Sequence, residues 1–107
     1  MLNEAHITTR NLEFAIIVPI LNEHDNIQPL LDALAKALEG LNWEAVFVDD
    51  GSRDGSIDLL LALAAANPKV RLVQRLGRRG LSTAVVEGMM ATAAPIVGVI
   101  DGDLQHD

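Results

Sequence analysis

Apolar and polar positions along the chain follow two alternating periods. Short, continuous apolar runs predict buried strands, and these runs cover residues 14–20, 43–48, 70–74 and 96–100. Between the runs, apolar side chains recur at the spacing of a helix, which predicts helices over residues 27–38, 57–66 and 81–92. We expect Asp25 or Asn26 to cap the first helix and Gly40 to end it.

Strands separated by helices of this length predict a parallel sheet with right-handed crossovers. We therefore expect an α/β fold, with a Rossmann-like three-layer α/β/α arrangement around a mostly parallel sheet. In such sheets a ligand binds outside the carboxyl ends of the strands, where the strand order reverses. The loops with unusual chemistry all follow a predicted strand and cover residues 21–23, 49–55, 75–80 and 101–107. This asymmetry predicts a functional cleft along one rim of the sheet.

The composition narrows the classes of protein to consider. Hydrophobic residues make up 50% of the 107 residues, but only two Phe and one Trp add aromatic bulk, so we expect an aliphatic core. The formal net charge of −7 argues against binding to a nucleic-acid backbone. The lack of cysteine excludes disulfides, thiolate zinc sites and thiol catalysis, and it fits a reducing cytoplasm.

The chain divides into a polar leader over residues 1–12 and a globular part over residues 13–107. The leader lacks the apolar centre of a signal peptide. No apolar run approaches the length of about 18 residues that a membrane-spanning helix needs. Any membrane span is therefore expected beyond Asp107.

Two acidic clusters come at the ends of predicted strands. Asp49 and Asp50 follow one apolar run, and Asp101 and Asp103, separated by Gly102, follow another. Carboxylates this close repel each other unless a cation or hydrogen-bond donors compensate, and Mg2+ and Mn2+ prefer oxygen ligands. The second cluster therefore favours a metal site. Asp50, Gly51 and Ser52 equally suit a turn, in which Asp and Ser side chains bond nearby amides and Gly adopts a positive φ.

Three arginines and two methionines are expected to have mainly structural roles. Arg75, Arg78 and Arg79 are expected to lie largely on the solvated surface, with one of them available to a phosphate. Met89 and Met90 are expected to serve in packing.

The loops carry the motifs of a known family. Residues 17–23 (IVPILNE), 48–56 (VDDGSRDGS) and 101–107 (DGDLQHD) come in the order and spacing of a family 2 glycosyltransferase of GT-A fold, which the chain resembles. Residues 77–84 and 87–89 are similar to the polyprenyl- or dolichyl-phosphate mannosyltransferase branch. The resemblance spans residues 13–107. It implies the nucleotide-sugar-binding part of a glycosyltransferase domain that is truncated at its C-terminal end.

The resemblance implies a role for each matching position. Residues implied to bind the nucleotide sugar are Pro19, Leu21, Glu23, Val48, Asp50, Asp101, Gly102 and Asp103. Asp50 would accept hydrogen bonds from the base. Leu21 stands where the family often has Tyr, and Gly102 where it often has Ala. Asp101 and Asp103 would be the catalytic carboxylates, and together with Gln105 they would hold Mg2+ or Mn2+.

The implied reaction moves mannose or another hexose from GDP-mannose or a UDP-sugar to a polyprenyl phosphate lipid. The metal would neutralise the charge that develops on the leaving nucleoside diphosphate. The parent enzyme would work in the cytoplasm, at the cytoplasmic face of the membrane, and this chain alone is expected to be inactive. The open edge of the last strand also suggests pairing into a homo-oligomer.

Two other functions fit parts of the pattern. A Mg2+-dependent phosphoacceptor signalling domain also places carboxylates at strand ends, but its acid pair would follow the first strand, whereas here the pair follows the second. A non-catalytic nucleotide-binding module would have the same cleft. Metal-dependent nucleotide binding without sugar transfer would identify such a module.

Overall fold

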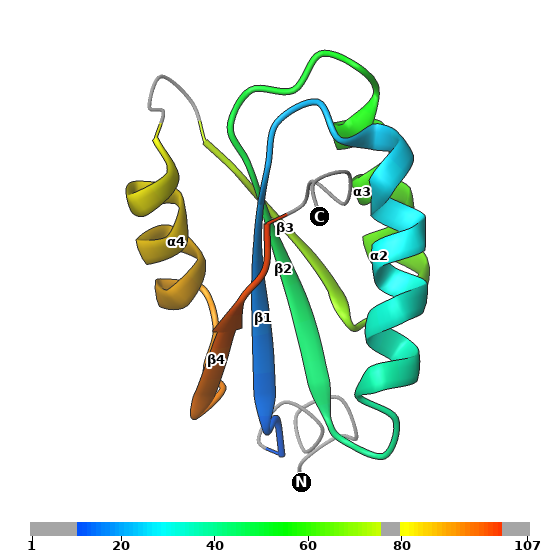
Figure 1. The fold of residues 1–107 in the computed structure, drawn as a ribbon, viewed down its shortest axis with the longest axis vertical. Helices are drawn as coiled ribbons and strands as arrows, with labels where there is room; N and C mark the ends of the chain where they lie inside the picture. The colour runs from blue at the N-terminus through cyan, green and yellow to red at the C-terminus, as the bar shows by residue number, and fades with distance from the viewer. Residues whose placement is uncertain (1–10, 76–79, 102–107) are drawn as a thin grey trace, which may run out of the picture.

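The sheet contains four parallel strands. In the computed structural model, which describes residues 11–75 and 80–101, they are β1 (Phe14–Ile20), β2 (Trp43–Asp49), β3 (Val70–Gln74) and β4 (Ile96–Val99). Their order across the sheet is β3-β2-β1-β4 (Figure 1). All three neighbouring pairs are parallel. The prediction of a parallel sheet is confirmed, with β3 and β4 as its edges.

Helices cover both faces of this sheet. Helices α2 (His24–Ala37) and α3 (Ser56–Ala66) lie on one face, and α4 (Leu81–Met90) lies on the other (Figure 1). The chain steps in one direction from β1 to β3 and then returns past β1 to β4. Right-handed crossovers in opposite directions place their helices on opposite faces. The three-layer α/β/α arrangement is therefore confirmed.

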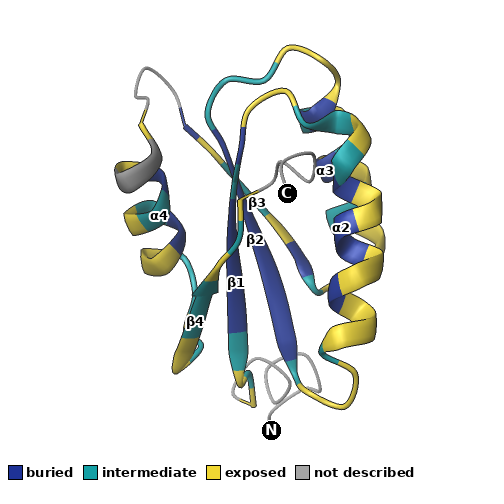
Figure 2. Cartoon of the chain, viewed as in Figure 1, coloured by how far each residue is buried: buried dark blue, intermediate teal, exposed yellow. Residues whose placement is uncertain are grey.

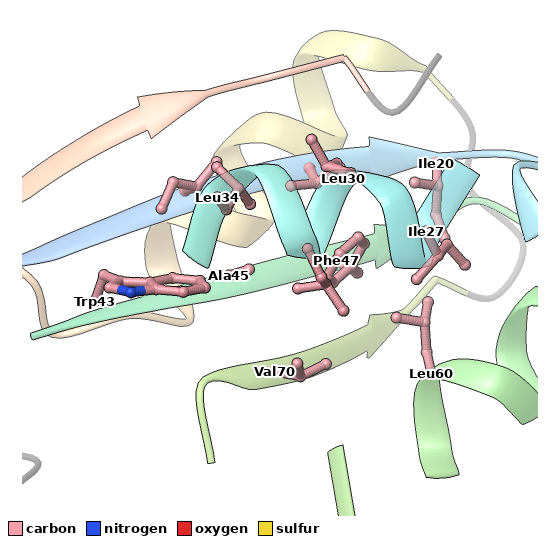
Figure 3. Packing of buried hydrophobic residues seen from close by; sticks show 12 residues of the cluster. Ile20, Ile27, Leu30, Leu34, Trp43, Ala45, Phe47, Leu60 and Val70 are labelled. Atoms are coloured by element: carbon pink, nitrogen blue, oxygen red, sulfur yellow. The ribbon is translucent and has the colours of Figure 1, made fainter. Parts of the chain in front are cut away.

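The core is aliphatic, as expected, and is densest around β2. Every residue of β2 is buried (Figure 2). Between the sheet and helices α2 and α3, the side chains of Phe47, Ile27 and Leu60 pack together (Figure 3). A smaller cluster of Ile17, Val46, Val48 and Ala84 lies under α4. The sheet is thus a rigid base for the loops at its carboxyl edge.

Several predicted boundaries and environments are corrected by the structure. Helix α2 begins at His24, so neither Asp25 nor Asn26 is its cap. It ends at Ala37, and Gly40 lies in the following turn with φ +90°. Helix α4 ends at Met90 instead of residue 92, and β4 ends at Val99 instead of residue 100.

The methionine interpretation is also wrong. Met89 is 49% exposed and Met90 is 81% exposed, because both project from the side of α4 that faces away from the sheet. Among the residues that the structure describes, no helix has the length and apolar character needed to cross a membrane.

Candidate functional site

A pocket of about 200 Å³ opens at the carboxyl edge of the sheet. It lies where β1 has β2 on one side and β4 on the other, so that the strand order reverses there. This is the position at which parallel α/β sheets bind ligands. The residues that line it are Pro19, Ile20, Leu21, Glu23, Asp50, Ala84 and Asp101.

The structure thus gathers five predicted site residues around one hollow: Pro19, Leu21, Glu23, Asp50 and Asp101. Val48 is different, since its side chain is fully buried in the cluster under α4 and does not line this pocket. Gly102, Asp103 and Gln105 lie outside the described residues.

Asp50 is held firmly at the wall of the pocket. Its amide donates to the carbonyl of Ile20 at 3.1 Å, which ties the end of β2 to the end of β1. Its Oδ2 accepts a hydrogen bond of 3.1 Å from the amide of Gly80. Its Oδ1 is buried and lies 3.1 Å from Nη1 of Arg75, an ion pair that lacks the angles of a hydrogen bond. The side chain as a whole remains 17% exposed.

Arg75 is buried, so its expected place on the solvated surface is wrong. Its side chain has no exposed area. The guanidinium lies 3.2 Å from Oε2 of Glu87 and donates to the carbonyl of Gly80 at 2.9 Å and to Oγ1 of Thr83 at 2.5 Å. A buried charge is tolerated when it is paired and hydrogen-bonded in this way. Arg78 and Arg79 lie outside the described residues.

Asp49 organises the loop that follows β2. Its carboxylate is buried, and Oδ2 accepts hydrogen bonds of 2.9 Å from the amides of both Gly51 and Ser52. Gly51 has φ +110°, a conformation that glycine adopts without strain. The turn predicted for Asp50, Gly51 and Ser52 is therefore wrong in its acidic residue: Asp49 accepts the two amides, and Asp50 faces the pocket.

The loops after β1 and β2 are joined side by side. Asn22 donates its amide to Oγ of Ser52 at 2.8 Å and accepts the amide of Arg53 on Oδ1 at 2.7 Å. Oδ2 of Asp54 accepts the amide of His24, the first residue of α2, at 3.0 Å. This bond explains why α2 starts earlier than predicted, since its cap is supplied by a residue 30 positions further along the chain.

Asp54 caps two helices with one carboxylate. Its Oδ2 accepts the amide of His24 in α2, and its Oδ1 accepts the amide and the hydroxyl of Ser56, the first residue of α3. Burial acts to raise the pKa of the Asp54 carboxyl, but the hydrogen bonds from Ser56 and His24 outweigh it and hold the pKa below its ordinary value. The helix dipole also favours negative charge at a helix N-terminus.

We expect Asp54→Ala to lower the free energy of unfolding at pH 7 by about 1 kcal/mol, the typical value of a lost cap. Because the pKa is lowered in the folded chain, this stabilisation is present above pH 3.8 and is lost as the pH falls through the lowered pKa. Urea unfolding of both chains from pH 7 to pH 2.5 measures the difference. Asp58→Ala, which removes an exposed acid from the first turn of α3, is the control and should cost less than about 0.5 kcal/mol. A difference that grows toward low pH would contradict this assignment.

The carboxylates of the pocket differ in what they offer a metal ion. Oε1 of Glu23 accepts a hydrogen bond from Asn26 at 2.8 Å, and Asp50 is engaged by Gly80 and Arg75. Asp101 is exposed on the pocket wall just after β4. Within residues 11–75 and 80–101, no three His, Cys, Asp or Glu side chains form a group that could hold a metal. A carboxylate such as that of Asp101 has the oxygen chemistry that a hard cation prefers, and the other predicted ligands, Asp103 and Gln105, lie outside the described residues.

Comparison with known proteins identifies the family. The glycosyl transferase family 2 model matches residues 15–107. Curated relatives include the dolichol-phosphate mannosyltransferases of Pyrococcus furiosus, 36% identical over 89% of this chain and 27% of the relative, and of Saccharomyces cerevisiae, 37% identical over 90% and 37%. The chain therefore spans about a third of the length of these relatives.

Solved structures agree on the fold. A mannosyltransferase from Pyrobaculum calidifontis in complex with GDP-Man and Mn2+ superposes with a TM-score of 0.71 at 28% identity, over 85% of this chain and 27% of that one. Glucosyl-3-phosphoglycerate synthase from Mycobacterium tuberculosis, solved with Mn2+ and UDP, gives 0.69 at 25% identity over 91% and 36%. These matches place the sheet and its helices in the GT-A fold. With its family match over nearly the whole length, this chain belongs to glycosyl transferase family 2.

Proposed function

We propose that this chain is the donor-binding part of an enzyme that moves a hexose from a nucleoside-diphosphate sugar to a polyprenyl phosphate. The observation that carries the proposal is the pocket at the reversal of strand order, where the carboxyl ends of three strands bring together Pro19, Leu21, Glu23, Asp50 and Asp101. Residues 13–107 would form this part, and residues 1–12 a leader.

The pocket offers suitable groups for a nucleotide. Asp50 presents a carboxylate that can accept N–H groups of a base, and Leu21, 42% exposed, offers an apolar side chain to the face of a base or ribose. Pro19 and Glu23 complete this wall. Asp101, Gly102 and Asp103 would run along the diphosphate. Val48 would contribute only through the strand that positions Asp50, because its side chain is buried.

We propose Mg2+ or Mn2+ as the cofactor, held by Asp101, Asp103 and Gln105. When bound, the ion would neutralise the charge that develops on the leaving nucleoside diphosphate. The solved relatives that contain Mn2+ together with GDP-Man or UDP support this proposal. The residues of this chain would bind the base, orient the diphosphate and hold the anomeric carbon open to attack.

The acceptor proposal rests on the named relatives. Besides the dolichol-phosphate mannosyltransferases, they include dodecaprenyl-phosphate galacturonate synthase of Rhizobium johnstonii, which is 30% identical over 92% of this chain and 30% of the relative. A phosphate oxygen of the lipid would bond to the anomeric carbon as the bond from that carbon to the diphosphate breaks. An acceptor that is already anionic needs little help from a general base. Because its polyprenyl tail lies in lipid, the enzyme would act at a membrane surface, and we propose the cytoplasmic face.

The test is calorimetric titration of this chain with GDP and UDP, with and without Mn2+. We expect one nucleotide to bind more tightly when Mn2+ is present, and Asp101→Ala to weaken that binding at least about tenfold, as expected for the loss of a charged contact. Asp32→Ala, which removes an exposed acid from α2 outside this pocket, should leave the binding unchanged. Failure of both nucleotides to bind with Mn2+ would count against the proposal.

A non-catalytic nucleotide-binding module differs from this proposal only in the transfer step. A lipid-phosphate glycosylation assay on a protein that contains this chain distinguishes the two. Metal-dependent binding in the absence of any transfer would favour the module.

A further inference from the structure

One buried cation joins the pocket to α4. The guanidinium of Arg75 lies between two carboxylates from different layers of the fold, with Nη1 3.1 Å from Oδ1 of Asp50 and Nε 3.2 Å from Oε2 of Glu87. Its remaining N–H groups donate to the carbonyl of Gly80 and the hydroxyl of Thr83 at the start of α4. The side chain has no exposed area, so Arg75 itself does not reach a ligand in the pocket.

This pairing decides which oxygen of Asp50 meets a ligand. Oδ1 is buried against Arg75, while the side chain as a whole is 17% exposed. The accessible oxygen is therefore Oδ2, which accepts one hydrogen bond from Gly80 and retains a second lone pair. The ion pair with Arg75 fixes the orientation of the carboxylate, and an ionised carboxylate can only accept hydrogen bonds.

We propose that Arg75 is a positioning residue that sets the base selectivity of the pocket by fixing Asp50 as an acceptor. The inference rests on the proposed function, in which Asp50 faces the base. Guanine and uracil present a ring N–H on the edge that such an acceptor would read, whereas adenine and cytosine present a lone pair on that ring nitrogen and can donate only through the neighbouring exocyclic amine. A site built to bond the ring N–H therefore favours bases that carry it over bases that present a lone pair in the same place.

Arginine suits this task for a geometric reason. Its planar fork holds five N–H donors in fixed directions, and here they reach Asp50, Glu87, Gly80 and Thr83 at the same time. The point charge of a lysine ammonium cannot pair with both carboxylates in this arrangement. The position of Asp50 is thereby tied to the position of α4.

The experiment compares the affinities of this chain for GDP, UDP and ADP in the presence of Mn2+, before and after substitution of Arg75. We define selectivity as the ratio of the ADP dissociation constant to that of the preferred nucleotide. Arg75→Met should reduce this ratio about ten- to a hundredfold, the range of a hydrogen bond to a charged group, and Arg75→Lys should reduce it less. Either variant, if folded and fully selective, would overturn the proposal.

Arg71→Met is the matched control. Arg71 lies on β3, the strand that Arg75 follows, and it pairs with Glu44 of β2 at 3.2 Å, but it is outside the pocket. Its loss should lower the melting temperature and leave the selectivity unchanged. If the unsubstituted chain does not distinguish GDP or UDP from ADP, the proposed role of Asp50 in base binding is wrong. If it does distinguish them but the Arg75 variants remain fully selective, only the proposed role of Arg75 is wrong.

A second measurement needs no nucleotide. Arg75→Met and Asp50→Asn are combined, and the unfolding equilibrium constants of the single and double variants are compared by urea denaturation. If Arg75 holds Asp50 through their charges, the effects should couple by at least about tenfold. Additive effects would overturn the proposal even if no nucleotide bound.

Discussion

Gly88→Val is expected to lower the free energy of unfolding by about 3 kcal/mol, at the upper end of the cost of overfilling a core. Gly88 lies in α4 where the helix meets the sheet, and a Cβ there would overlap Cγ2 of Ile17 and come within 3.1 Å of Cγ2 of Val48. Both neighbours are fully buried, so neither side chain has room to move aside. Thermal unfolding should show a drop of about 10 °C or more.

A substitution to valine on a solvent-exposed helix face provides the control for Gly88. Ala62→Val on the exposed side of α3 introduces a β-branched residue without a neighbour to displace, and it should cost less than about 0.7 kcal/mol. Gly88→Ala should fall between the two, because alanine favours the helix by about 1 kcal/mol but brings the same overlap. A Gly88→Val chain that is as stable as the Ala62→Val chain would refute the close approach of α4.

Asp49→Ala is expected to lower the free energy of unfolding by about 2 to 4 kcal/mol. It removes the one oxygen that accepts the amides of Gly51 and Ser52 and leaves both donors without that partner. Bonds to a charged acceptor contribute about 1.5 to 3 kcal/mol each, less the cost of burying the carboxylate. Urea denaturation gives the total, and hydrogen exchange at the amides of Gly51 and Ser52 locates the effect.

Asp49→Asn separates the hydrogen bonds from the charge. Its side-chain oxygen can still accept both amides, so we expect less than half the loss caused by Asp49→Ala. Oδ1 of Asp49 has no hydrogen-bond partner among the described residues, and the asparagine NH2 would occupy that place. Equal losses in the two variants would show that charge, and not the turn, is what Asp49 supplies.

The periodicity of the sequence was sufficient to predict the parallel sheet, the helical layers that cover it and the edge of the sheet where the pocket lies. Strand β1 matches its predicted residues, and β2 is longer than predicted by only Asp49. Continuous apolar runs predict strands well because all their side chains are buried when helices cover both faces of a parallel sheet. The prediction that the chemistry gathers at one edge also holds for Leu21, Asp50 and Asp101, which line one pocket. Local patterns determine these features, so a single sequence reveals them.

Contacts between distant residues account for what the sequence did not reveal. The burial of Arg75 depends on Asp50 and Glu87, which lie on other elements, and nothing in its neighbourhood along the chain marks it as buried. The early start of α2 depends on Asp54, which is separated from His24 by 30 positions. An aspartate two positions before the first residue of α3 is a recognisable signal for an Asx turn, but the second role of Asp54 becomes visible only in three dimensions.

The shared cap has a consequence for the order in which the fold assembles. Helix α3 can form its first turn with Asp54 as soon as that short segment is made, since Ser56 is two positions away. Helix α2 is synthesised earlier, yet its first turn stays incomplete until β2 has been added beside β1 and has brought Asp54 within reach of His24. Glu23, at the start of α2, lies on the pocket wall. The pocket wall at Glu23 is therefore completed only after β2 has paired with β1, although Glu23 precedes β2 in the chain.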